Sequence, residues 1–350
     1  MKNENSYSLI EKALHYLALD FKFTREFAFD LECDFFLKKN KKIVEMYYDE
    51  RSIHVCGLAR SGTTLLLNLL YGTGQFYSLS YRNMPFVMSP NFWKLISNNF
   101  RIKGELKERA HGDGMLINFD SVEAFEEIFW STFCKVDKNN KIAYDIKSPD
   151  KEILDKFSNF KKNLFLSNFT SNRLRYLSKN NNNCIRINEI LSDSSSVVLL
   201  VYRNPMETAK SLLRMHENFL DKNSSKFDNK YFEWLGHHEF GINQKPFILN
   251  GRRFNSQYEK KDVRYWCEYW YFFYKNTVQN ILNKDNLYLF DYDKLCSNPK
   301  EQLTKLSVVS DSDVKNVDLH INSNIFTSSS CGFDEIDRFY DYLTDHEKNI

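Results

Sequence analysis

The chain has almost no net charge, few prolines and no long apolar run. Its 48 Lys and Arg residues nearly cancel its 46 Asp and Glu residues, which removes the overall basic excess that a dedicated nucleic-acid-binding protein usually carries. No stretch approaches the roughly 18 apolar residues that cross a bilayer, and the N-terminal residues lack the apolar core of a signal peptide. We therefore expect no nucleic-acid partner and no transmembrane segment, and any anion-binding site must be local.

Paired cysteines are also missing. The seven cysteines are widely scattered, none belongs to a CxxC pair, and their number is odd. This pattern predicts reduced, mostly buried thiols and a cytoplasmic protein. No proline- or glycine-rich linker divides the chain, which holds only 6 prolines and 11 glycines.

Apolar and aromatic residues are plentiful instead. They make up 42% and 16% of the chain, with 30 Phe and 20 Tyr, so a large core can form and the chain is not disordered. We expect one domain over residues 1–350. It would comprise an N-terminal helical segment at 1–50, an α/β core at 51–305 with an insertion at 221–262, and a C-terminal segment at 306–350.

Four β-rich runs predict the strands of the core. They occupy residues 52–56, 141–146, 196–202 and 286–290. The run at 196–202 is continuously apolar, as expected of a strand buried on both faces of a sheet. Helical stretches separate the runs, which favours an α/β fold with a mostly parallel central sheet and helices on both sides.

A phosphate-binding pattern follows the first predicted strand. The loop GLARSGTT at 57–64 precedes an apolar helical run, and this order suits an anion, because glycines allow close backbone approach and a helix N-terminus offers N–H groups. A nucleoside triphosphatase loop requires Lys where this sequence has Thr63, and the cation here is Arg60. The loop therefore suits one terminal phosphate better than a triphosphate with magnesium. The candidate ligands are Gly57, Arg60, Ser61, Gly62, Thr63 and Thr64.

A second phosphate-binding pattern follows the apolar third strand. Asn204 is a good N-cap, Pro205 suits the first helical position, and Glu207 stands three residues after the cap, so a helix is predicted to begin here. Arg203 lies at the carboxyl end of the strand, and Ser211 lies about two turns into the helix. A phosphate near the helix start can contact both Arg203 and Ser211.

These two segments resemble the phosphate-binding motifs of sulfotransferases that use 3′-phosphoadenosine 5′-phosphosulfate (PAPS). Residues 57–64 are similar to the family's 5′-phosphosulfate loop, and residues 203–211 are similar to its 3′-phosphate motif, an Arg followed eight residues later by a Ser. With a softer likeness at 287–299, the resemblance spans residues 50–305. It implies a P-loop nucleotide-binding fold of the sulfotransferase type, as in the bacterial and Golgi branch, with PAPS as co-substrate and no metal.

The resemblance also implies catalytic roles. Lys147 follows a predicted strand and resembles the Lys of the family's Lys-x-Pro segment, which lies near the bridging oxygen; a surface lysine is the alternative. For the proton acceptor we favour His111, because imidazole titrates near neutral pH, and Glu126 or Glu127 could serve instead. Asp113 could orient His111 or bind a sugar hydroxyl.

The predicted reaction is in-line transfer of a sulfuryl group from PAPS to a hydroxyl of a carbohydrate or another small acceptor. Sulfotransferases that modify protein tyrosines carry a Glu about twenty residues after the first loop. The equivalent residues 77–82 contain no acid here, which argues against a protein tyrosine as the acceptor. The rival functions are a nucleotide or sugar kinase, which the missing Lys at position 63 opposes, and a noncatalytic protein that binds a nucleotide or a glycan.

Two polar features are expected to be ordinary surface. Residues 179–183, KNNNN, form a polar tract that suits an exposed turn or helix end. The neighbouring His237 and His238 lack metal-ligand spacing with Cys or another His. Neither feature is assigned a chemical role.

Overall fold

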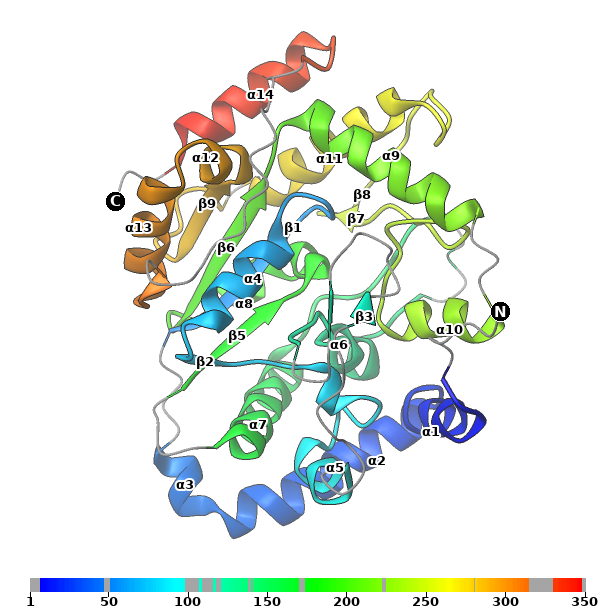
Figure 1. Cartoon of the computed structure of the whole chain (residues 1–350), viewed down its shortest axis with the longest axis vertical. Coiled ribbons are helices and arrows are strands. Elements are labelled where there is room, and N and C mark those ends of the chain that lie inside the picture. The colour runs from blue at the N-terminus through cyan, green and yellow to red at the C-terminus, as the bar shows by residue number, and fades with distance from the viewer. Residues whose placement is uncertain are drawn as a thin grey trace.

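The computed structural model describes residues 7–46, 51–97, 107–108, 116–117, 121–137, 140, 142–169, 174–221, 225–279, 281–314 and 330–347. Within them, five strands form a central parallel sheet in the order β2–β5–β1–β6–β9 (Figure 1). The strands are β1 (Ser52–Gly57), β2 (Phe76–Tyr77), β5 (Arg175–Lys179), β6 (Ser196–Tyr202) and β9 (Leu287–Asp291). The predicted α/β class with a mostly parallel sheet is confirmed.

Helices cover both faces of this sheet (Figure 1). One face packs its apolar side chains against α4 (Thr63–Gly72), α12 (Tyr292–Ser297) and α13 (Pro299–Ser310). The other face packs against α6 (Glu127–Phe133), α7 (Lys151–Asn168) and α11 (Val263–Val278), whose aromatic side chains form much of the larger core. Because both faces are covered, the central strands β1 and β6 are buried along their whole length.

The remaining elements surround these two layers. The N-terminal segment forms α1 (Leu9–Leu19), α2 (Lys22–Glu32), a π-helical turn (Cys33–Leu37) and α3 (Lys41–Met46), which agrees with the expected amphipathic helices. The others are η2 (Tyr81–Asn83), α5 (Pro90–Ser97), β3 (Lys107–Glu108), β4 (Leu116–Ile117), η3 (Asn181–Ile185), α8 (Ile187–Leu191), α9 (Pro205–Asp221), α10 (Lys226–Trp234), β7 (Ile248–Leu249), β8 (Arg252–Arg253) and α14 (Asp334–Asp345). Across the described ranges, no helix has the length and apolarity to cross a membrane.

Two strand predictions need correction. No strand forms at 141–146: Tyr144 and Ile146 make only isolated bridges, to Phe247 and Val136. The sheet contains β5 instead, a strand that was not predicted from the sequence. Two of its five residues are charged, and it nevertheless lies inside the sheet, because long-range partners satisfy them.

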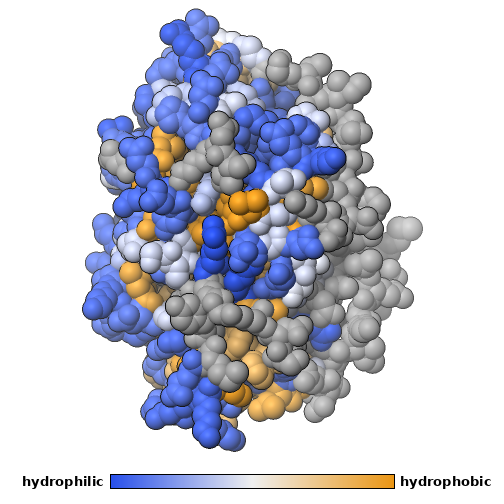
Figure 2. All heavy atoms as spheres, turned by 90° about the vertical axis from the view of Figure 1, so that its left-hand side faces the viewer, coloured by the Kyte–Doolittle hydropathy of each residue, from blue (hydrophilic) through white to orange (hydrophobic). Residues whose placement is uncertain are grey.

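The side of the molecule that carries α12 and α13 is polar (Figure 2). Its coloured surface is mainly hydrophilic, with small and separate hydrophobic areas. The apolar residues of α13 that face inward, such as Leu303 and Leu306, belong to the core against the sheet. On this side, the coloured surface therefore shows no continuous apolar area.

Candidate functional site

The loop between β1 and α4 is folded tightly against its neighbours. Gly57 and Gly62 have φ angles of 156° and 96°, in the region that favours glycine. A Cβ atom at Gly57 would lie 2.3 Å from the carbonyl oxygen of Val201, and one at Gly62 would lie 2.2 Å from Cδ2 of Tyr292. Glycine is therefore required at both positions, and the loop backbone lies directly against β6.

The first turn of α4 points toward the loop. The N–H groups of Leu65 and Leu66 donate to the carbonyl of Gly62, at 3.0 Å and 3.3 Å. The N–H groups of Thr63 and Thr64 precede them and have no acceptor within an α-helix, by the geometry of any helix start. Together with the helix dipole, they offer positive potential to an anion in the loop.

The second predicted segment forms as expected. Asn204 caps α9, with its Oδ1 accepting from the N–H of Glu207 at 3.1 Å, and Pro205 is the first helical residue. Arg203 therefore lies between the end of β6 and the start of the helix. The predicted helix start is confirmed.

The two segments are in contact. Nε of Arg60, in the loop, donates to the hydroxyl oxygen of Ser211, in α9, at 3.1 Å. β1 and β6 are parallel neighbours, and Gly57 pairs with Val201, so both segments leave the sheet at the same edge. The carboxyl edge of a parallel sheet is the usual place for a nucleotide in folds of this type.

Arg203 already has a partner in this structure. Its Nε lies 3.4 Å from Oδ1 of Asp293, and its guanidinium lies over the ring of Tyr292, 5.1 Å from the centroid. Burial raises the pKa of Asp293, while the N–H of Asn204 and the charge of Arg203 act in the opposite direction. A guanidinium has further N–H donors, so this contact orients Arg203 and leaves it able to bind a phosphate in addition.

The polar tract after β5 is buried, which corrects the expectation of an exposed turn. Asn180, Asn181, Asn182 and Asn183 are each less than a tenth exposed. The N–H of Asn180 donates to the carbonyl of Val55 in β1 at 3.0 Å, and the hydroxyl of Thr63 donates to Oδ1 of Asn181 at 3.4 Å. The tract therefore forms the wall of the loop on the β5 side. The sequence held no signal for this, because β5, the strand that precedes the tract, was itself not predicted.

Two lysines have different surroundings. The side chain of Lys147 is exposed, and its backbone N–H donates to the backbone carbonyl of Lys135. Among the described residues, no hydrogen bond or ion pair joins it to the loop. Lys179 is the last residue of β5, pairs in register with Val55 and is 7% exposed. The lysine that reaches the carboxyl edge of the sheet is therefore Lys179, which sequence reasoning missed.

The two candidate glutamates belong to a buried network. Arg186 binds both oxygens of Glu127, at 2.9 Å and 3.0 Å, and the same carboxylate accepts from the hydroxyl of Tyr144 and the amide of Asn180, both at 2.8 Å. Glu127 is fully buried. Burial lowers the pKa of Arg186, but the charge and hydrogen bonds of Glu127 together with neighbouring groups raise it overall, so the guanidinium stays ionised.

Glu126 is similarly enclosed. Its oxygens accept from the indole of Trp130 at 2.7 Å, the hydroxyl of Tyr176 at 2.7 Å and the amide of Asn183 at 3.0 Å. Burial raises its pKa, but the charge of His54 and these hydrogen bonds lower it overall. Both carboxylates thus have the surroundings of structural groups. The other two candidates for proton transfer, His111 and Asp113, lie outside the described residues.

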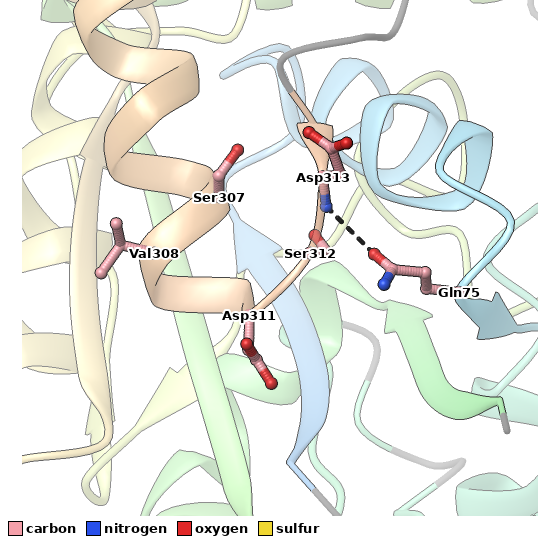
Figure 3. Close-up of a pocket in the computed structure, with 6 residues that line it drawn as sticks. All are labelled: Gln75, Ser307, Val308, Asp311, Ser312 and Asp313. Atoms are coloured by element: carbon pink, nitrogen blue, oxygen red, sulfur yellow. Dashed lines mark hydrogen bonds between the residues drawn. The ribbon is translucent and has the colours of Figure 1, made fainter.

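A pocket of about 370 Å³ lies elsewhere on the molecule (Figure 3). It is lined by Gln75, Ser307, Val308, Asp311, Ser312 and Asp313. The N–H of Asp313 donates to the side chain of Gln75 at 3.0 Å, and the carbonyl of Gln75 accepts from Arg175, the first residue of β5. The pocket therefore lies at the amino edge of the sheet, opposite the loop, and its two aspartates disfavour a phosphate.

Solved structures that resemble this chain include sulfotransferases. Sulfotransferase STF1 from Mycobacterium tuberculosis H37Rv aligns over 90% of this chain and 81% of its own, at 12% identity and a TM-score of 0.49. Sulfotransferase STF9 from Mycobacterium avium aligns over 91% and 74%, at 11% identity and a TM-score of 0.40. A retinol dehydratase in complex with retinol and PAP aligns over 86% and 67%, at 12% identity and a TM-score of 0.27.

No family model and no curated protein matches the chain. Since the three TM-scores are below 0.5 and the identities are at most 12%, we take the function from the geometry of this chain's own residues.

Proposed function

We propose that this chain is a sulfotransferase that moves a sulfuryl group from PAPS to a hydroxyl of a carbohydrate or another small acceptor. The observation that carries the proposal is the contact between Arg60 and Ser211 at 3.1 Å, which joins two anion-binding segments of different kinds. The segments follow neighbouring parallel strands and are about 140 residues apart in sequence. A nucleotide with a phosphate at each end of its ribose fits such a pair.

The donor would be held by residues from both segments. The 5′-phosphosulfate would bind Arg60, the side chains of Ser61, Thr63 and Thr64, and the N-terminal N–H groups of α4. The glycines at 57 and 62 let it approach the backbone. The 3′-phosphate would bind Arg203 and Ser211, at the start of α9.

The leaving group needs positive charge as the bond between sulfur and the bridging oxygen breaks. Arg60 and the N-terminus of α4 would supply part of it. Lys179, at the end of β5, is better placed for the remainder than Lys147, which lies on the surface. We assign Glu127 to folding, since its oxygens already accept four hydrogen bonds.

The rest of the proposal follows the sequence. A single domain over 1–350 and a cytoplasmic location are part of it. All seven cysteines are among the described residues and are free thiols, which suits a reducing compartment. His111 with Asp113 stays a prediction from the sequence.

The proposal is tested by donor choice and by transfer. Purified protein is titrated calorimetrically with 3′-phosphoadenosine 5′-phosphate (PAP) and with ATP and magnesium, and ³⁵S-labelled PAPS is then incubated with a panel of sugars and simple alcohols. We expect PAP to bind, ATP to bind weakly, and label to appear in at least one acceptor. Tight binding of ATP with magnesium and none of PAP would support the kinase. Binding of PAP without transfer across the panel would support a noncatalytic protein.

A further inference from the structure

The segment that follows α10 is fixed onto the asparagine tract. The amide of Asn182 donates to the carbonyl of Gly236 at 3.1 Å, and a Cβ atom at Gly236 would lie 2.4 Å from Cγ of Glu127. Gly236 has a φ angle of 69°, which favours glycine as well. Residues 237–239 are thus held against the end of β5 by contacts on both sides of the backbone.

A chain of side-chain contacts connects this segment to the loop. The hydroxyl of Thr63 donates to Oδ1 of Asn181 at 3.4 Å, and Nδ2 of Asn181 donates to Oε1 of Glu239 at 3.3 Å. The other oxygen of Glu239 lies 3.3 Å from Nδ1 of His237. The carboxylate of Glu239 therefore lies two hydrogen bonds from Thr63, the first residue of α4, and the imidazole of His237 lies three.

His237 and Glu239 form a dyad that is largely shielded from water. The side chains of His237 and Glu239 are 15% and 10% exposed. Burial raises the pKa of Glu239, but the charge and hydrogen bond of His237, followed by the charge of Lys179, lower it to about 2. An ionised carboxylate beside Nδ1 favours a proton on that nitrogen, which makes Nε2 the accepting nitrogen of the neutral ring.

The position of the dyad suits an acceptor. Both phosphates of the proposed donor would lie over β1 and β6, and β5 is the neighbour of β1 on the opposite side. The dyad lies against the tract that follows β5. An acceptor that approached the loop from this side would lie beside the tract that carries the dyad, without competing for Arg203 or Ser211; Nε2 of His237 is buried, so contact with it requires the neighbouring side chains to move.

We infer that His237 is the general base that receives the proton of an alcohol or sugar hydroxyl, with Glu239 as its positioning residue. The inference rests on the proposed function. Neutral Nε2 takes the proton while the hydroxyl oxygen forms its bond to sulfur; the bond from sulfur to the bridging oxygen breaks, and its electron pair stays on the phosphate. The imidazolium then returns its proton to solvent. Asn181 keeps Glu239 at a fixed distance from the loop.

The charged groups around the dyad do not repeat its arrangement of a carboxylate beside Nδ1 of a histidine. Lys179 faces Glu239 from β5, and Lys245 and Glu127 face the adjacent His238. The ring of His238 lies 4.5 Å from that of Tyr144, and burial lowers its pKa to about 4. It is therefore a neutral packing residue, and only His237 among the two has a carboxylate on Nδ1 at hydrogen-bonding distance.

The test compares His237→Asn, Glu239→Gln and Glu239→Asp with His346→Asn, a change at an exposed histidine at the end of α14. PAP binding is measured by calorimetry, and transfer of the ³⁵S label from PAPS is measured as the labelled sulfate ester of 1-hexanol or p-nitrophenol, or as free labelled sulfate with water alone. We expect unchanged PAP affinity in all four variants. His237→Asn should slow transfer to hexanol and water by about 100-fold or more and transfer to p-nitrophenolate much less, because an ionised acceptor needs no base.

Glu239 gives the finer readout. Glu239→Gln should slow transfer to hexanol and shift its pH dependence. Glu239→Asp keeps the carboxylate and should recover part of the rate that Glu239→Gln loses, which a merely structural role would not produce. A second signal uses protein labelled with ¹³C at histidine: PAP should move the His237 ring resonance, assigned by its loss in His237→Asn, and leave that of His346 unmoved.

The outcomes separate the two proposals. Failure of the wild-type protein to bind PAP overturns the proposed function and the base with it. Binding of PAP with normal hexanol or water turnover in His237→Asn overturns the base alone. If PAP binds, no acceptor reacts and the His237 resonance does not move, the dyad is not at the donor site and the inference is wrong.

Discussion

Two polar clusters meet at the carboxyl edge of the sheet, and they differ in how completely they are satisfied. In the buried cluster, formed by Glu126, Glu127, Arg186, Asn180 and Asn183, every carboxylate oxygen accepts from a donor at 2.7–3.0 Å. In the loop cluster, formed by Arg60, Thr63, Arg203 and Ser211, the contacts are 3.1–3.4 Å long and the arginines are partly exposed. Arginine side chains are thus fully paired in one cluster, and in the other they are the residues that we propose bind a ligand.

The energetic reason is burial. A charge removed from water is tolerated only when paired and hydrogen-bonded, so each member of the buried cluster is essential to the fold. In the loop cluster Thr63 is buried, but Arg60, Arg203 and Ser211 keep some contact with water, which a ligand could replace. Substitutions in the first cluster should therefore change stability, and those in the second should change affinity.

The largest expected effect comes from Arg186→Met. It leaves the carboxyl group of Glu127 buried without its cation, which costs about 3–5 kcal/mol in the free energy of unfolding. Urea denaturation followed by circular dichroism measures this loss. The double change Arg186→Met with Glu127→Met should recover part of it. A single variant as stable as the wild type would contradict the structural role of the pair.

Glu239 lies between the clusters and should show the next effect, in acid. Its folded pKa of about 2 is below the ordinary value of 4.5, so it stabilises the fold above pH 4.5, and this contribution is lost as the pH falls toward 2. The shift corresponds to at most about 3 kcal/mol. The stability difference between wild type and Glu239→Gln should therefore shrink between pH 4.5 and 2. A constant difference would show that the carboxylate is not held ionised.

Arg203→Ala should act on affinity. Loss of a charged phosphate contact corresponds to about 1.5–3 kcal/mol, or about 10- to 100-fold in the dissociation constant of PAP. Stability should change less than in Arg186→Met, because the Arg203 and Asp293 side chains are 16% and 17% exposed. Calorimetry measures the PAP affinity and urea denaturation measures the free energy of unfolding. Arg338→Ala, at an exposed arginine of α14, is the control. A large loss of stability with unchanged affinity would assign Arg203 to folding.

The smallest effect is expected at Gly62. Gly62→Ala and Gly74→Ala both place a side chain at a left-handed φ angle, 96° and 70°, at about 1–2 kcal/mol each. Only Gly62→Ala meets a neighbour, Tyr292, whose ring lies under Arg203; nothing lies within 4 Å of a Cβ at Gly74. We expect the larger loss of stability in Gly62→Ala, because its Cβ also meets the ring of Tyr292, and weaker PAP binding only in that variant. If Gly62→Ala and Gly74→Ala bind PAP equally well, the backbone at Gly62 does not affect the phosphate contact of Arg203.

The sequence revealed the parts of the fold that depend on local signals. β1, β6 and β9 are apolar runs beside recognisable loops, and Asn204 with Pro205 marks the start of α9. β5 was missed because its Arg175 is satisfied by the carbonyls of Ser310 and Asp311, more than 130 residues away. No local pattern reports such partners.

The same distinction holds for the site. The two segments predicted to bind phosphate were selected by short motifs, and the structure brings them together because they follow neighbouring parallel strands. The asparagine tract and the His237–His238 pair were assigned to the surface, because the partners that enclose them are distant in sequence: Asn181 and Glu239 are 58 residues apart and meet only in the folded chain. Glu127 was taken as a candidate base for the same reason, since its bond to Arg186 spans 59 residues.

The central claim is that the loop and the start of α9 bind opposite ends of one nucleotide. Its most direct test is a calorimetric titration of wild type and Arg203→Ala with PAP, adenosine 5′-monophosphate and adenosine 3′-monophosphate. We expect wild type to bind PAP more tightly than either monophosphate, and Arg203→Ala to weaken PAP and the 3′-monophosphate while the 5′-monophosphate binds as before. If PAP binds no better than the 5′-monophosphate, or the variant weakens all three equally, the claim is wrong.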